Sequence, residues 1–104
     1  MDSFKDREKN FEKKFAHDEE KLFKINARRN KYLAEWAFEK LNKNDSEKDI
    51  YIQEVIKSDF AEPGDEDVFK KIKGDLNKVG FENIDDEIRN KMNETMERAK
   101  KDFS

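Results

Sequence analysis

The chain of 104 residues is long enough for one small domain, and it has neither an internal repeat nor a Gly/Ser-rich linker that would indicate two. Charged residues make up 47% of it and apolar residues 34%, but the net charge is only -3 and the apolar residues recur at helical spacing, which favours amphipathic helices over disorder. The absence of cysteine excludes disulfides, thiolate metal sites and thiol nucleophiles, and the interleaving of lysines with carboxylates leaves no continuous basic stripe for nucleic acid.

No apolar run reaches the ~18 residues that a membrane-spanning helix needs, and the N-terminus has no apolar segment of the signal-peptide type. We therefore expect a cytoplasmic protein that is not inserted in a membrane.

The first expected element is a helix over about residues 3–42, and its N-terminal half has a narrow apolar face. At about 100° per residue, four side chains fall within roughly 40° of one another. This seam consists of Phe4, Phe11, Phe15 and Leu22. A helix with so narrow an apolar face needs few neighbours and frays in water. We therefore expect residues 1–19 to form a mobile arm, partly disordered when free, and residues 20–104 to form the folded body.

The C-terminal half of the same helix has a much wider apolar face. Its apolar residues spread over roughly 220° of the helix surface, as expected when several neighbours cover it. They are Phe23, Ile25, Ala27, Leu33, Ala34, Trp36, Ala37, Phe38 and Leu41. Asn42 and Asn44 are plausible left-handed terminators of this helix.

Three shorter helices are expected after it. Ser46 resembles the start of a capping box, and the second helix then runs over about 46–61 with a stripe of Ile52, Val55, Ile56 and Phe60. The third runs over about 65–79, ends at Gly80 and carries Val68, Ile72, Leu76 and Val79. The fourth is capped by Asn83 or Asp85 and presents Ile84, Ile88, Met92, Met96, Ala99 and Phe103. The expected fold is all-α, a four-helix bundle with a long first helix.

The residues capable of catalysis or metal binding form no recognisable constellation. His17 is the only histidine, so an ordinary zinc site or a nucleophile dyad is excluded, and its open readings are a solvated side chain, a partner contact or a pH-dependent modulator. The basic run 28–31 is read as a solvated or ion-paired face, with anion binding as the alternative. Phosphate-binding glycine motifs are missing, and we expect no cofactor, no bound metal and no enzymatic activity.

Several runs of residues resemble one known family. In the arm they are Phe4-x-x-Arg7-Glu8-x-x-Phe11-Glu12-x-Lys14-Phe15-Ala16-His17-Asp18, followed by Ala27-Arg28-Arg29-Asn30-Lys31 and Leu33-x-x-Trp36-Ala37. Asp59-Phe60, Gly64-Asp65-Glu66-Asp67-Val68 and Ile88-Arg89 also match its pattern. In these residues the chain resembles the zeta subunits, which inhibit the bacterial F-type ATP synthase.

The resemblance implies a regulatory subunit whose N-terminal helix inserts at a catalytic interface of the ATP synthase head and stops ATP hydrolysis. The implied partners are the alpha, beta and gamma subunits, and the implied location is the cytoplasmic side, peripheral to the inner membrane. Carried over by position, the apolar anchors would be Phe4, Phe11 and Phe15, and the charged or polar contacts would be Arg7, Glu8, Glu12, Lys14 and His17.

In one alternative the seam folds back onto the bundle of its own chain, and two further readings remain open. In the first, the chain is a helical adaptor or a homodimer that pairs its seam with a second copy, whereas the inhibitor reading expects a monomer when free. In the second, the arm lies on a membrane surface, but its polar side mixes acids with lysines and so lacks the basic face such helices use.

Overall fold

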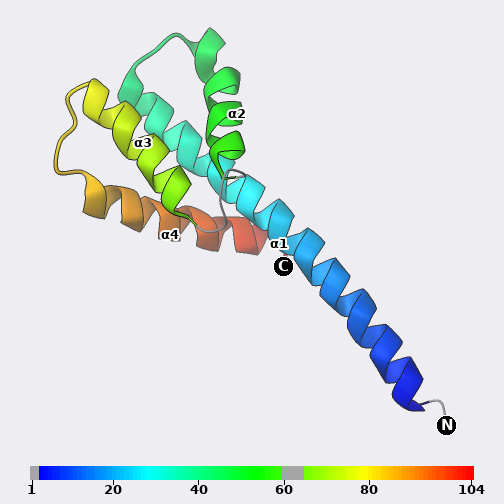
Figure 1. The fold of residues 1–104 in the computed structure, drawn as a ribbon. Helices are drawn as coiled ribbons and strands as arrows, with labels where there is room; N and C mark the ends of the chain where they lie inside the picture. The colour runs from blue at the N-terminus through cyan, green and yellow to red at the C-terminus, as the bar shows by residue number, and fades with distance from the viewer. Residues whose placement is uncertain (1–2, 60–64) are drawn as a thin grey trace.

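The computed structural model describes the backbone of residues 3–59 and 65–104 and the side chains of 19–59 and 65–104. Within these residues the chain is all-α, as predicted, with four α-helices and one short 3-10 helix (Figure 1). They are α1 (Ser3–Leu41), η1 (Asp45–Glu47), α2 (Lys48–Ser58), α3 (Glu66–Lys78) and α4 (Asp85–Asp102). None of the described helices is long and apolar enough to cross a membrane.

Helix α1 is far longer than the bundle that packs against it. Its 39 residues correspond to about 58 Å at 1.5 Å per residue. Figure 1 shows α2, α3 and α4 gathered around its C-terminal half, with the N-terminal half projecting away from them. The molecule accordingly measures 65 × 28 × 24 Å. The predicted overhang of the first helix is confirmed.

The core lies where all four helices meet. Its buried side chains on α1 are Leu33, Ala34, Ala37, Phe38 and Leu41, joined by Tyr51, Ile52 and Val55 from α2, by Val68, Phe69, Ile72 and Leu76 from α3, and by Ile84, Ile88 and Met92 from the fourth helix and its N-cap. The predicted stripes therefore supply most of the core. Phe23 was wrongly assigned to it, since this side chain remains 56% exposed.

The helix ends follow the sequence only in part. Asn42 has a φ of 53° and Gly80 a φ of 98°, so both adopt the left-handed conformation predicted for helix terminators. The predicted N-caps of the second and fourth helices were wrong. Ser46 lies inside η1, and the N-cap residues of α2 and α4 are Glu47 and Ile84, neither of which makes a side-chain cap hydrogen bond.

The arm itself is described only in its backbone. Residues Ser3 onward belong to α1, but side chains up to Asp18 lie outside the described residues. The expected mobility of residues 1–19 and the division at residue 20 thus stay predictions.

Candidate partner-binding site

The predicted partner-binding residues all lie on the projecting half of α1. The structure gives this half one continuous helical backbone, which preserves the relative directions assumed from the sequence. The side chains of Phe4, Arg7, Glu8, Phe11, Glu12, Lys14, Phe15 and His17 lie outside the described residues. The seam can therefore be followed at its fourth member, Leu22.

Leu22 is 54% exposed, although it is a large apolar side chain in an ordered helix. The neighbouring side chains Glu19 to Lys24 are exposed as well, and Ile25 is the first buried side chain in the described part of α1. Close packing in the described part of α1 thus begins at Ile25. Leu22, the described end of the seam, therefore lies outside the closely packed part of the bundle and stays largely uncovered.

Leu22, the described member of the seam, lies on the same side of α1 as the core. At about 100° per residue, Arg29 and Leu33 fall within about 20° of Leu22 on the helix projection. Both are buried, with 1% and 0% exposure respectively. A protein that covered the seam would therefore lie on the side of α1 to which α2, α3 and α4 pack, and it would face the near end of the bundle.

The C-terminal end of α4 lies at this near end, beside α1 (Figure 1). Arg28 Nη1 lies 3.3 Å from Asp102 Oδ2, and the Tyr32 hydroxyl donates to the same carboxylate oxygen. The hydrogen bond with Tyr32 is the largest cause that raises the pKa of the Arg28 guanidinium, and Asp102 adds a smaller effect, although desolvation opposes the change. Arg98 stacks on the Tyr32 ring, 3.9 Å from its centroid. These contacts fasten the end of α4 to α1.

The basic run 28–31 is mainly an ion-paired segment, as one of its two readings predicted. Arg28 pairs with Asp102 and Arg29 with Asp65. The sequence reading missed the burial of Arg29 and Asn30, each only 1% exposed. A signal was available, because Arg29 lies on the projected core face of the helix, where a charged residue is unusual.

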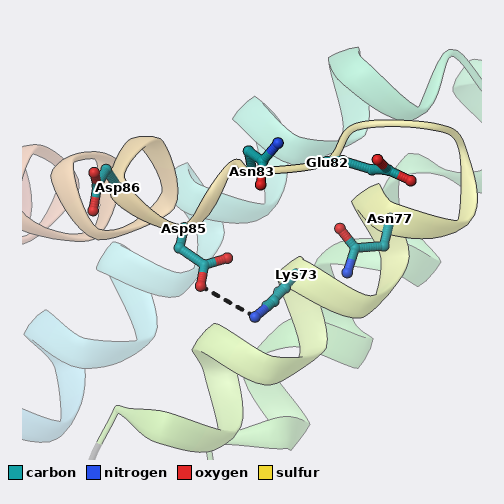
Figure 2. A pocket seen from close by; sticks show the side chains of 6 residues that line it. All are labelled: Lys73, Asn77, Glu82, Asn83, Asp85 and Asp86. Carbon is teal, nitrogen blue, oxygen red and sulfur yellow. Dashed lines mark hydrogen bonds and ion pairs between the residues drawn. The ribbon is translucent and has the colours of Figure 1, made fainter.

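A polar hollow of about 610 Å³ lies between α3 and the start of α4, away from the seam. Figure 2 shows Lys73 joined to Asp85, with Asn77 on α3 and Glu82, Asn83 and Asp86 farther along the chain. Its lysine is already paired at 3.1 Å. Among the described residues, no three His, Cys, Asp or Glu side chains gather as a metal site would require. The hollow therefore offers no chemistry that competes with the arm as the candidate site.

A comparison with protein-family models decides the family. The model for ATPase inhibitor subunit zeta matches residues 1–102. The chain belongs to this family. The match spans both the projecting half of α1 and the bundle, so the two parts form one family unit. No curated protein and no solved structure matches the chain. Membership of the zeta family supports a regulatory role as an inhibitor associated with the ATP synthase.

Proposed function

We propose that the protein blocks ATP hydrolysis by the F-type ATP synthase by inserting the N-terminal half of α1 at a catalytic interface of the head. The family supports the inhibitory role. The observation that carries the insertion mechanism is the exposure of Leu22, at 54%, on a helix that runs on beyond the bundle. A long helix with a narrow apolar seam suits a groove between subunits better than a flat surface.

The proposed energy source is burial of the seam. Covering a large apolar side chain contributes roughly 1.5 to 3 kcal/mol, against which stands the cost of ordering the helix and of association. The burial of all four seam side chains contributes more free energy than the few kcal/mol that ordering of the helix costs. Inhibition of useful strength therefore requires most of the seam to be covered at once.

In this mechanism the anchors are Phe4, Phe11 and Phe15, continued by Leu22. The polar flanks, Arg7, Glu8, Glu12, Lys14 and His17, contact charged groups of the alpha, beta and gamma subunits. The protein itself performs no catalysis and needs no cofactor. It acts on the cytoplasmic side, peripheral to the inner membrane through the ATP synthase, and is a monomer when free.

The first test compares the full chain with a variant that lacks residues 1–19. Each is titrated into purified ATP synthase head from the same source while ATP hydrolysis is measured. We expect inhibition by the full chain alone, because the truncated variant keeps the bundle but loses three of the four anchors. Equal inhibition by both proteins would move the site to the bundle. No inhibition by either folded protein would favour the adaptor or homodimer, which sedimentation would then reveal.

The second test concerns the described end of the seam. Replacing Leu22 by Ser should raise the half-maximal inhibitory concentration about tenfold, because about 1.4 kcal/mol of apolar burial is lost in the complex. The matched control is Ile50→Ser on α2, which removes a similarly exposed apolar side chain, 63% exposed, from a helix that does not carry the seam. Equal effects of the two substitutions would contradict a specific role for the seam.

A further inference from the structure

Three consecutive residues of α1 each form a hydrogen bond or an ion pair with an aspartate at the end of a different helix. Arg28 Nη1 lies 3.3 Å from Asp102, the last residue of α4. Arg29 Nη2 donates to Asp65 Oδ1, 2.9 Å away, at the N-cap of α3. Asn30 Nδ2 donates to Asp59 Oδ2, 3.1 Å away, at the C-cap of α2. We call these six residues the polar collar.

The collar surrounds α1 over a wide arc. Consecutive residues of a helix point about 100° apart, so Arg28, Arg29 and Asn30 together span about 200° of its circumference. Apolar contacts are not directional and tolerate small rotations, whereas hydrogen bonds weaken steeply as their geometry is lost. The collar therefore opposes rotation of α1 about its own axis more strongly than the apolar core does.

Arg29, the central residue of the collar on α1, also forms a hydrogen bond with its neighbour on the same helix. The Arg29 guanidinium is 1% exposed, and its Nε donates to Asn30 Oδ1 at 2.6 Å, which links two of the three contacts. A buried guanidinium contributes little net stability compared with an apolar side chain of similar size, because desolvation offsets the attraction. Its directional bonds are thus a better explanation of its placement than stability is.

Two of the aspartates carry a negative charge at a helix end where the dipole of their own helix disfavours it. Asp59 and Asp102 lie at the C-terminal ends of α2 and α4, where the helix dipole disfavours negative charge. Among the contacts described for these two carboxylates, all are with α1. Asp59 accepts a hydrogen bond from Asn30, and Asp102 interacts with Arg28 and Tyr32, and these contacts offset the unfavourable helix dipole. The contacts with α1 therefore account for the placement of both carboxylates.

From this geometry we infer that the polar collar fixes the rotation and direction of α1 where it leaves the bundle, and so sets the side to which the seam faces, with Arg29 as the positioning residue. The inference rests on the proposed function. A partner that meets both the seam and the near end of the bundle can bind both only if their relative direction is correct, and fixing it beforehand lowers the entropy lost on binding.

The test replaces Arg29 by Met, which keeps an unbranched side chain of similar length but forms none of the directional bonds. Asp65 is 53% exposed and can be solvated by water when its partner is lost. Because the chain has no cysteine, spin labels can be attached at Lys21→Cys on the arm side and Asn93→Cys on α4, both exposed. The distance distribution between the labels measures the direction of the arm without any partner.

We expect a single narrow distance peak in the parent chain, a broader one in Arg29→Met, and a half-maximal inhibitory concentration about threefold higher or more for that variant. A matched pair guards against a folding defect. Asp65→Asn and Glu66→Gln each remove one ion-paired negative charge from the start of α3, but Glu66 pairs with Arg89 of α4 and not with α1. Asp65→Asn should broaden the peak, and Glu66→Gln should not.

An unchanged narrow peak in both Arg29→Met and Asp65→Asn would overturn the inference. A broadened peak with unchanged inhibition would overturn the role of the collar in inhibition. Failure of the proposed function is recognised separately, because the parent chain would then show its narrow peak but would not inhibit ATP hydrolysis.

Discussion

Tyr51 shows how one residue couples the core to the charged surface of this bundle. Its ring packs 6.1 Å from that of Phe38, and its hydroxyl is buried beside Asp75 without a well-formed hydrogen bond among the described residues. Burial, and then the negative charge of Asp75, raises the pKa of the phenol. Lys71 lies 3.0 Å from Asp75 and 3.1 Å from Glu54, and these carboxylates raise its pKa although burial opposes the change.

This environment predicts an alkaline loss of stability. The unfolded chain releases the phenol proton near pH 10, whereas the folded protein retains it, so the stabilisation is complete below about pH 10 and is lost as the pH rises further. The slope from one such group is up to about 1.4 kcal/mol per pH unit. Urea unfolding between pH 8 and 11 should show a smaller decline for Tyr51→Phe than for the parent chain.

The matched control for this prediction is Tyr32→Phe, the other tyrosine of the chain, which lies outside the core. We expect Tyr51→Phe to reduce the decline above pH 10 more than Tyr32→Phe does, because the Tyr32 hydroxyl lies outside the core and donates to Asp102. The same steep decline in all three proteins would assign the alkaline transition to other groups, such as the lysines.

At the scale of the elements, the periodicity of apolar residues predicted the helices correctly. The residue types at the expected caps predicted only some of the helix ends. The stripe of Val68, Ile72 and Leu76 depends only on neighbours three and four residues away, so the sequence reveals it directly. The cap predicted at Ser46 failed because a 3-10 turn over Asp45–Glu47 precedes α2 and takes up that residue. The prediction at Asn42 was correct because the left-handed conformation of this residue requires no partner distant in the sequence.

The candidate site was predictable to the extent that it depends on one helix. The direction of the seam follows from spacing within α1, and Leu22 is exposed as that reading requires. The collar was not predictable, because its bonds join residues 29, 36 and 74 positions apart in the sequence. The same reason explains the error at Phe23, because its angle fits the wide face but its burial depends on where helices distant in the sequence pack, and it remains 56% exposed.

The whole molecule consists of a bundle and a projecting helix, and this division predicts how stability is distributed. Removing residues 1–19 should change the melting temperature by less than about 2 °C, because the first buried side chain in the described part of α1 is Ile25, six positions beyond the cut. Circular dichroism would show a lower helical signal with an unchanged midpoint. As a control for sensitivity, Leu33→Ala in the core should cost about 2 to 5 kcal/mol and lower the midpoint clearly.

A fall of more than about 5 °C on deletion would correspond to about 1 kcal/mol of lost packing and would mean that the seam folds back onto its own bundle. In that case the arm would have to detach before it could bind the ATP synthase, and the apparent affinity would be reduced by the fraction of molecules in the detached state. An unchanged midpoint instead leaves the seam available at all times. The inhibitory strength is then set by the contacts with the partner and by the direction in which the collar holds α1.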